Sequence, residues 1–219
     1  MKNLLSTVII ILIAISLLAC NNKKEKTLQD EATEIVEEIE KLPEAKSSSD
    51  KKMFKIESAY VKYNMKAAGQ DMVREWWFDQ YGNRQLEDSY LTIMGEKAGG
   101  MTLTADGYMY KWDYDATEGT RMKFYAPAAT DYDDISKDDI ERYGIEKHGY
   151  EDIAGKKCLK VTTKKPIEST VWIWENIPMK TISNFAGNEV VMEAVEIKTG
   201  KLNNVSFEIP QEITFTDYQ

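Results

Sequence analysis

The chain has 219 residues, of which 37 are acidic and 28 are basic, for a net charge of −9 at pH 7. This acidic balance argues against nucleic acid as a partner, because its phosphates would be repelled, and against broad electrostatic adhesion to anionic lipid. Behind an apolar N-terminus and an acidic leader, roughly 165 residues remain, enough for one domain with a sizeable core.

The N-terminus has the pattern of an export signal. Lys2 supplies a positive charge ahead of an apolar run that ends in Leu17-Leu18-Ala19-Cys20. This ending resembles the lipobox of bacterial lipoproteins, in which a small residue precedes the cysteine. The resemblance implies that residues 1–19 are cleaved as a signal peptide. It also implies that Cys20 becomes the lipidated, palmitate-carrying first residue of the mature protein.

The alternative is a membrane-spanning helix over residues 4–19, but this run is shorter than the ~20 residues that a span needs. Without Lys2 the mature chain has a net charge of −10, so the lipid on Cys20 is its expected attachment to the membrane. Asn21 and Asn22 follow the cysteine in place of an aspartate retention signal. By resemblance to enteric sorting rules, this favours the outer membrane of the cell envelope.

Residues 20–52 are predicted to form a lipidated tether with one amphipathic helix over 28–42 and a Ser/Lys linker behind it. Thr27 can cap this helix, and Pro43 ends it. Its polar face is acidic, which is the wrong sign for anionic lipid. Packing on the parent domain is therefore favoured over a membrane-surface or partner helix.

From residue 53 the apolar period changes to two, which is typical of strands with one wet face. Asp106-Gly107 is the strongest hairpin signal, and a helix is predicted only over 136–143, capped by Ser136 and ended by Gly144. No βαβ rhythm is present, so a single, mainly β domain over 53–219, with an antiparallel sheet of hairpin-connected strands, is expected. The predicted strands cover residues 57–65, 72–80, 84–94, 101–105, 108–112, 121–125, 144–148, 157–163, 168–174, 179–185, 189–198 and 205–209.

Patterns that would support catalysis are sparse. His148 is the only histidine and is assigned to a strand end or turn, so no His-rich metal site can form. Ser48 and Ser49 each begin a Ser-x-x-Lys match, but the companion elements of penicillin-recognising enzymes are missing. The sequence thus predicts no enzyme, no catalytic or metal-binding residues and no cofactor. A glycosidase that uses carboxylates alone stays as an open alternative.

Two further features have an ordinary structural interpretation. With Cys20 lipidated, Cys158 is left alone, so an intramolecular disulfide is impossible and a buried small side chain is expected. The acidic run over 131–141 offers oxygen ligands for calcium, but it lacks the glycine and ligand periodicity of a calcium loop. A solvated helix start is favoured instead, because negative charge is stabilising there.

Aromatic side chains form the candidate ligand-binding set. Residues two apart on a strand share a face, so the tyrosines and tryptophans of 108–112 lie together, as do those of 172–174. They either form a core packed against a helix or present a surface to an apolar ligand or a partner. The candidate ligand-binding residues are Trp76, Tyr108, Tyr110, Trp112, Trp172 and Trp174.

Three segments carry a resemblance to a known family: Gly155 to Val161, Glu168 to Lys180, and Phe207 to Pro210. With the lipobox, they resemble a group of Bacteroidetes-type uncharacterised lipoproteins, which are similar to the outer-membrane lipoprotein carrier (LolA/LolB-like) superfamily. The resemblance covers about residues 53–215. It implies a curved antiparallel sheet, an unclosed half-barrel covered by one or two helices on its concave side, that binds acyl chains there.

The family's characteristic cavity arginine has no recognisable position in the sequence, so transfer of lipoproteins is not carried over. The resulting hypothesis is a membrane-anchored, non-enzymatic lipoprotein that binds an apolar or lipid-like ligand. The alternative is a surface or periplasmic protein-interaction module, whose partner the sequence does not identify.

Overall fold

The computed structural model describes residues 52–124, 132, 135–165, 167–185 and 188–218. The predicted signal peptide, Cys20 and the predicted helix over 28–42 lie outside these residues, as do Asp131, Asp133 and Asp134 of the acidic run. Among the helices of the described part, none is long and apolar enough to cross a bilayer.

The N-terminal half is a meander of antiparallel strands, in which each strand pairs with the next along the chain. A short 3-10 turn, η1 (Gln80–Gly82), joins its second and third strands. Its strands are β1 (Ala59–Ala67), β2 (Gln70–Asp79), β3 (Arg84–Ile93), β4 (Glu96–Ala105), β5 (Tyr108–Asp113) and β6 (Glu118–Lys123).

The C-terminal half is a second meander, preceded by the helix α3 (Lys137–Tyr143). Its strands are β7 (Glu146–Ile153), β8 (Lys156–Thr163), β9 (Ser169–Trp174), β10 (Ile177–Phe185) and β11 (Asn188–Thr199). A last short strand, β12 (Thr214–Asp217), runs parallel to β6.

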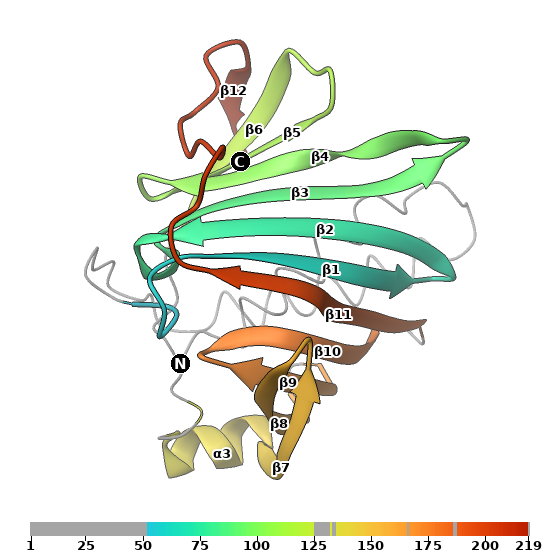
Figure 1. Cartoon of the computed structure of the whole chain (residues 1–219), viewed down its shortest axis with the longest axis vertical. Helices are drawn as coiled ribbons and strands as arrows, with labels where there is room; N and C mark the ends of the chain where they lie inside the picture. The colour runs from blue at the N-terminus through green and yellow to red at the C-terminus, as the bar shows by residue number, and fades with distance from the viewer. Residues whose placement is uncertain (1–51, 125–131, 133–134, 166, 186–187, 219) are drawn as a thin grey trace.

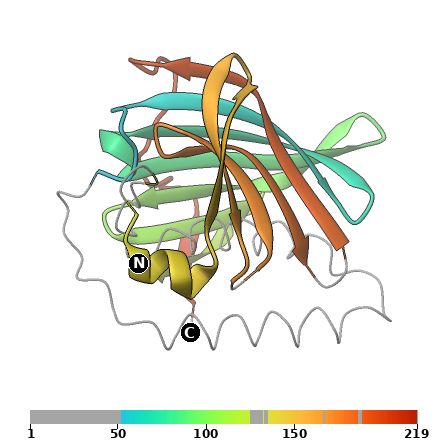
Figure 2. The same cartoon turned by 90° about the horizontal axis from the view of Figure 1, so that it is seen from below.

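One 12-stranded sheet contains both meanders, because β1 pairs antiparallel with β11. The strand order is β12-β6-β5-β4-β3-β2-β1-β11-β10-β9-β8-β7, so β7 and β12 are the two edges and the sheet does not close. Figures 1 and 2 show it as an arch whose two edges bend to the same side. The predicted fold class, a mainly β protein with a curved antiparallel half-barrel, is confirmed, and α3 is the α-helix of the described residues.

The helix α3 forms where the sequence predicts it. Ser136 has extended backbone angles, and its Oγ accepts a hydrogen bond from the Asp139 amide at 3.1 Å. Asp138 and Asp139 occupy the first turn, where negative charge is favourable, and Gly144 ends the helix with a positive φ of 61°. The helix-start interpretation therefore holds for the described part of the acidic run.

Several strand boundaries differ from the prediction. Gly99 and Gly100 fall between the predicted strands 84–94 and 101–105, yet both lie inside β4. A Cβ on Gly99 would overlap the Ser89 carbonyl oxygen and lie 2.7 Å from Tyr90 Cα. Glycine is needed there because β3 and β4 approach closely. Gly119 falls outside the predicted strand 121–125 and likewise lies in a strand, β6.

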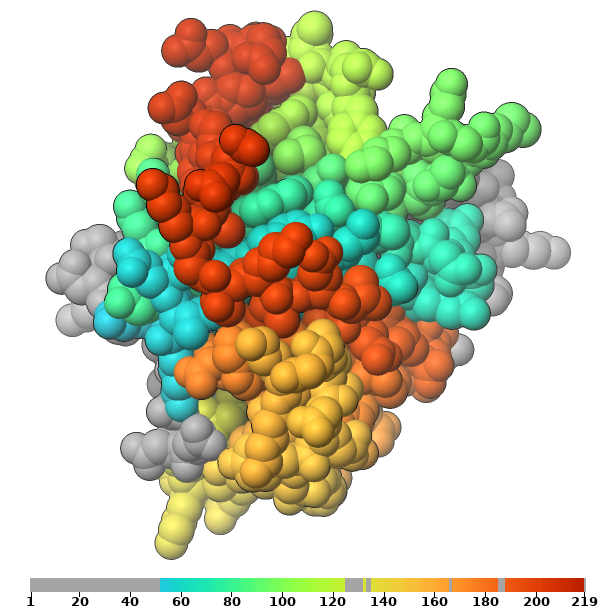
Figure 3. Space-filling view, viewed as in Figure 1, coloured from blue at the N-terminus to red at the C-terminus, as the bar shows by residue number. Residues whose placement is uncertain are grey.

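The C-terminal segment also differs. Residues 205–209 alternate like a strand, but they pair with no strand and form a loop; the final strand is β12, which was not predicted. Figures 1 and 3 show this segment crossing in front of the first meander. Its alternation reflects packing of Phe207 on a neighbouring strand surface.

His148 was predicted at a strand end or turn, and this is wrong. It lies inside β7, next to a register shift between Lys147 and Tyr150. Its Nε2 is 2.7 Å from Thr162 Oγ1 on the neighbouring strand, and the side chain is exposed.

Candidate ligand-binding face

The two faces of the sheet are told apart by what packs on them. The helix α3 contacts Val171 and Ile173 of β9, and Figure 2 shows it within the arch. Val171 is paired with Thr181, Thr181 with Met192, and Met192 with Met65 of β1. Because directly paired residues point to the same side of a sheet, all four side chains lie on one face. This face is called the inner face, and the opposite one the outer face.

Over β10, β11, β1 and β2 the inner face is apolar and rich in methionine, whereas over β3–β5 the pairing places Glu87, Thr102 and Lys111 on it. Large buried side chains alternate along β1 and β2, because every second residue points to the same side. Methionine has three rotatable bonds and adapts to irregular surfaces, so such a face can accommodate ligands of different shape. The buried residues of this cluster include Met53, Val61, Tyr63, Met65, Met72, Trp76, Phe78, Met179, Met192 and Ala194.

Phe54 packs against the inner face from the segment that precedes β1. Its ring centroid lies 5.2 Å from that of Trp76 in an edge-on arrangement and 4.5 Å from that of Phe78. The backbone amides of Met53 and Phe54 both donate to the Tyr81 carbonyl, at 2.9 and 3.1 Å. The segment is thereby fixed at the turn between β2 and β3.

Arg74 is a buried charge within this apolar surface. It lies on β2 between Met72 and Trp76, and its Nη2 is 2.5 Å from Glu87 Oε1 on β3. Its Nη1 reaches Met192 Sδ at 3.9 Å, so the side chain extends across β1 to β11. The guanidinium also lies 5.7 Å from the Trp76 ring centroid and 6.0 Å from that of Tyr63.

Three polar atoms of the inner face are buried and have no hydrogen-bond partner: Tyr63 Oη, Arg74 Nε and Thr181 Oγ1. Only 1% of Tyr63 and 3% each of Arg74 and Thr181 are exposed. Burial raises the pKa of Tyr63 well above its usual range, so the hydroxyl keeps its proton. Unsatisfied buried groups are rare in proteins and require an explanation.

Of the predicted ligand-binding residues, Trp76 lies on the inner face. It is buried, and its Nε1 donates to Gln85 Oε1 at 3.1 Å. Gln85 in turn donates from Nε2 to the Gly82 carbonyl at 2.8 Å. The indole is therefore held in one orientation by the turn that also fixes Phe54.

Tyr108, Tyr110 and Trp112 lie together on the outer face, where Leu103 completes a small cluster. The Phe215 ring packs edge-on against Tyr110 at 5.0 Å and against Trp112 at 5.8 Å. The side chains thus contact the C-terminal segment, which Figure 3 shows lying over this face.

Trp172 points to the side of β9 opposite Val171 and Ile173, yet it is buried and belongs to the same hydrophobic cluster as Trp76. Its Nε1 donates to Glu151 Oε2 at 2.8 Å, and the Nζ atoms of Lys160 and Lys180 lie 4.9 and 5.4 Å from its ring centroid. Trp174 is half-buried beside Lys156, whose Nζ lies 4.5 Å from its ring centroid. The six predicted residues are thus divided between the two faces.

Arg74, Tyr63 and Thr181 were missed by sequence reasoning, although a signal exists for Arg74. It occupies the apolar side of the predicted strand 72–80, where a charge is unexpected. A charged residue at such a position is expected to be paired. The residue directly opposite Arg74 is Ser89, not its partner Glu87. The alternation of polar and apolar residues therefore could not predict this ion pair.

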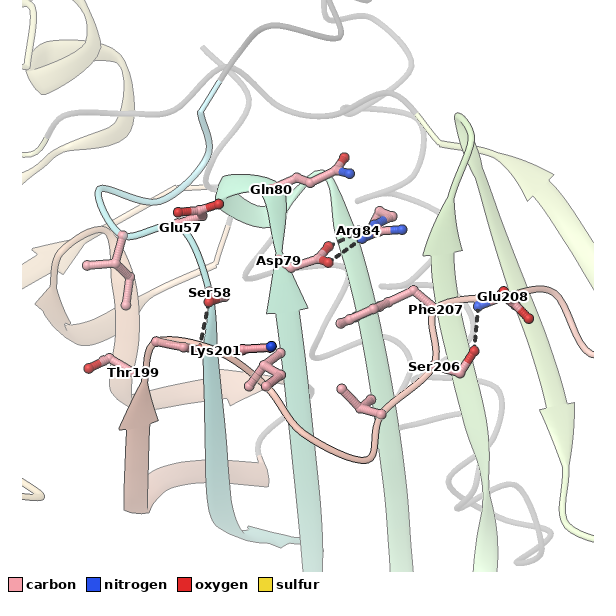
Figure 4. Close-up of a pocket in the computed structure, with 14 residues that line it drawn as sticks. Glu57, Ser58, Asp79, Gln80, Arg84, Thr199, Lys201, Ser206, Phe207 and Glu208 are labelled. Carbon is pink, nitrogen blue, oxygen red and sulfur yellow. Dashed lines mark hydrogen bonds and ion pairs between the residues drawn. The ribbon is translucent and has the colours of Figure 1, made fainter.

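A second site lies at the rim of the outer face. A pocket of about 900 Å³ opens between the end of β1, the turn after β2 and the C-terminal segment (Figure 4). Apolar side chains of Ile56, Leu202, Val205 and Phe207 are surrounded by charges of both signs. Arg84 Nε donates to Asp79 Oδ1 at 2.8 Å, and its Cζ lies 5.3 Å from the Phe207 ring centroid.

Cys158 is fully buried, as predicted, and its thiol donates to the Lys156 carbonyl at 3.2 Å. Burial is the main cause that raises the pKa of this thiol to about 11. A thiolate is therefore scarce at neutral pH. Within the described residues, no group of three or more His, Cys, Asp or Glu side chains is arranged to hold a metal ion.

No protein-family model matches the sequence, and no curated protein matches it either. Among solved structures, an uncharacterised conserved protein from Thermus thermophilus is similar over 85% of this chain and 99% of its own, with 10% identity and a TM-score of 0.52. This likeness concerns the fold alone.

Two further structures are similar at lower scores. MucB matches 74% of this chain and 60% of its own length, with 11% identity and a TM-score of 0.48. A LolA superfamily protein from Nitrosomonas europaea matches 82% of this chain and 94% of its own, with 11% identity and a TM-score of 0.31. At these scores neither likeness supports a statement about function.

Proposed function

We propose that this protein binds an apolar or lipid-like ligand on the inner face of its sheet, as a non-enzymatic binding protein. The observation that carries the proposal is the combination of a curved, unclosed sheet with a continuous methionine-rich surface. Lipid-binding sites need a large apolar area with few polar groups, and the inner face over β10, β11, β1 and β2 has this composition.

The outer face is the weaker candidate. Its aromatic cluster around Tyr110 is already in contact with Phe207 and Phe215 of the same chain. The inner face, by contrast, holds unsatisfied polar atoms within its apolar surface. Of the sequence-predicted residues, Trp76 is accordingly proposed as part of the ligand site, and Tyr108, Tyr110, Trp112, Trp172 and Trp174 are not retained in it.

Membrane attachment through a lipid on Cys20, with release of residues 1–19, belongs to the same proposal. An acyl anchor would hold the domain at a membrane of the cell envelope, because each buried methylene contributes about 0.8 kcal/mol. Such a location would place the inner face next to a source of apolar ligands.

The test uses the chain from residue 20 onward with Cys20→Ala, delipidated and titrated with 1-N-phenylnaphthylamine, a probe that fluoresces in apolar sites. Saturable fluorescence is expected. Met192→Gln on the inner face should weaken binding about tenfold, because a buried apolar side chain becomes polar. Met101→Gln, at a half-buried outer position, is the matched control and should leave the titration unchanged. Absence of saturable binding by the parent chain would rule the proposal out.

A second candidate function, a protein-interaction module, is favoured by the rim pocket. Its mixture of apolar floor and charges of both signs resembles the composition of polar protein interfaces more than that of a lipid site. A photo-crosslinking residue in place of Ser206 would test it in intact membranes. A discrete protein adduct that is lost with Phe207→Ala would support this function, and the absence of an adduct would oppose it.

A further inference from the structure

The C-terminal segment, residues 201–218, covers one edge of the sheet with a short strand of its own. β12 pairs with β6 over four residues in parallel orientation, whereas the other strand pairs of the described residues are antiparallel. Figure 1 shows β12 beside β6 at this edge. Parallel pairing is slightly less stable per residue. β12 is therefore held less firmly than the longer strands of the sheet.

The linker that leads to β12 is not tied to the sheet by its backbone. From Lys201 to Ile213, no backbone–backbone hydrogen bond is made with another described residue. Gly200 and Thr214, on either side of this stretch, each donate one, to Ser58 and Thr117. Dissociation of β12 therefore disrupts no other backbone pairing. Local opening of such a segment costs much less free energy than unfolding of the domain.

β12 is anchored by one aromatic side chain, Phe215. It is opposite Gly119 of β6, where a Cβ would lie 2.7 Å from both Phe215 Cε1 and the Lys111 carbonyl oxygen. The absence of a side chain at Gly119 thus admits the ring, which packs edge-on against Tyr110 and Trp112. Gly119 and the two rings form a notch for an aromatic side chain at the edge of the sheet.

A second contact lies two residues further along. Arg121 Nε donates to Asp217 Oδ1 at 2.7 Å, and Arg121 Nη2 donates to Oδ2 at 3.4 Å. Both side chains are exposed, so this ion pair contributes little to stability. It does select a carboxylate at this position. The Arg121 guanidinium is itself oriented, because its Cζ lies 5.4 Å from the Tyr108 ring centroid.

We infer that the β6 edge is a docking site for an extended segment of another protein, which adds to β6 as a parallel strand in place of β12. This segment carries an aromatic residue for the notch at Gly119 and, two positions later, a carboxylate for Arg121. In such strand addition, main-chain hydrogen bonds supply affinity and alternate side chains supply specificity. The site is separate from the inner face, and β12 fills it while no partner is bound.

The linker determines how tightly a partner must bind. A strand on a flexible tether competes at an effective concentration on the order of millimolar. A partner segment therefore occupies β6 only if it binds more tightly than β12. A second copy of this chain offers the same segment as β12 but lacks the advantage of the tether. A different protein with a better-matched segment is therefore the favoured partner.

The test uses the chain from residue 20 onward with Cys20→Ala and a fluorescein-labelled peptide of residues 211–218, whose binding is measured by fluorescence anisotropy. The parent chain should bind the peptide weakly, because β12 competes. Phe215→Ala in the chain removes the anchor of β12 and should tighten peptide binding at least tenfold. Asp217→Asn should tighten it about threefold, because the lost ion pair is exposed. Tyr218→Ala, at an exposed position of the same segment, is the matched control and should change nothing.

A charge exchange locates the peptide on β6. Arg121→Glu, added to the Phe215→Ala chain, should weaken binding of the peptide at least threefold, because two carboxylates then meet. A second peptide, with lysine at the position of Asp217, should recover this loss. A third peptide, with alanine at the position of Phe215, should bind the Phe215→Ala chain at least tenfold more weakly than the original peptide.

The inference is overturned if the peptide does not bind the Phe215→Ala chain, binds it no more tightly than the parent, or binds equally well without its aromatic residue. If urea unfolding shows that Phe215→Ala does not fold, Asp217→Asn decides by the same criteria. A parent chain that dimerises by exchanging β12, as measured by light scattering, would overturn the assignment of a different protein as the partner. Binding of 1-N-phenylnaphthylamine to the inner face is measured independently, so the proposed function stands or fails separately.

Discussion

Arg74 and Glu87 form a largely buried ion pair across neighbouring strands, two residues away from direct register. The side chains meet on the diagonal, because Arg74 is opposite Ser89 and Glu87 is opposite Trp76. The pair places a full positive charge inside the apolar inner face, and Glu87 neutralises it there.

Removing one partner should therefore be far worse than removing both. Arg74→Met is expected to lower the free energy of unfolding by about 3–5 kcal/mol, since Glu87 is left buried without its partner. The double variant Arg74→Met/Glu87→Leu should recover most of this loss. Urea unfolding of the parent, the single variant and the double variant measures these losses, and an equal loss in the single and the double variant would contradict the ion-pair account.

Phe54 should contribute strongly to stability, although it precedes the first strand. Phe54→Ala is expected to cost about 3–5 kcal/mol, because the ring is buried against Trp76 and Phe78. Glu57→Ala nearby, at an exposed position, should change stability by about 0.5 kcal/mol or less. The midpoint of urea unfolding measures both, and a Phe54 effect as small as that of Glu57 would show that the segment is not docked.

Gly99 tests the close approach of β3 and β4. Gly99→Ala should destabilise by about 1–3 kcal/mol or more, because a Cβ would overlap backbone atoms that cannot rotate away. Gly69 has a positive φ of 81° and open space around it, so Gly69→Ala should cost only about 1 kcal/mol. Thermal unfolding of the two variants ranks them, and the opposite ranking would argue against the strand pairing given for β4.

Cys158 should be inert in the folded protein. With Cys20 replaced by alanine it is the only thiol, and both its burial and its pKa of about 11 suppress the reactive thiolate. A disulfide exchange reagent at pH 8 should react very slowly with the native chain and stoichiometrically in denaturant. Fast reaction without denaturant would mean that the β8 region opens readily.

Glu151 gives a prediction for pH. Its carboxylate accepts hydrogen bonds from Lys160 and Trp172, which hold the pKa of Glu151 below its usual value. A depressed folded-state pKa means that the contribution to stability is present above the unfolded pKa and is lost as the pH falls through the folded pKa. Carboxyl NMR titration should show the low pKa, and Lys160→Met should raise it toward the ordinary value. Lys164→Met is the control, since Lys164 pairs with Glu146, and should leave the Glu151 pKa unchanged.

The fold was largely predictable because period-two alternation persists from β1 to β11 and turn residues separate the strands. Asp106-Gly107 and the Ser136 cap were read correctly because each depends on residues close in sequence. The predicted strands leave out Gly99, because glycine occurs both at strand ends and at close contacts between strands, and only the neighbouring strand distinguishes the two.

The candidate site was less predictable. The rule that residues two apart on a strand share a face correctly places Tyr108, Tyr110 and Trp112 together. The rule does not show which of the two faces lies within the arch. That depends on α3 and the C-terminal segment, which pack from distant parts of the chain. The Arg74–Glu87 pair and the hydroxyls without a partner depend on residues that are close in space but distant in sequence. A local sequence pattern therefore cannot predict them.

The pairing of β1 with β11 has a consequence for how the protein folds. Each meander consists of contacts between strands that are neighbours in sequence, whereas this ladder pairs Ala59 with Thr199, so that both meanders lie within one long loop. Such closure is entropically costly and is typically slow. Tyr63 and Arg74 belong to the first meander, and Thr181 and Met192 to the second. Neither half alone therefore contains the complete inner face, and a ligand can bind there only after this long-range pairing has formed.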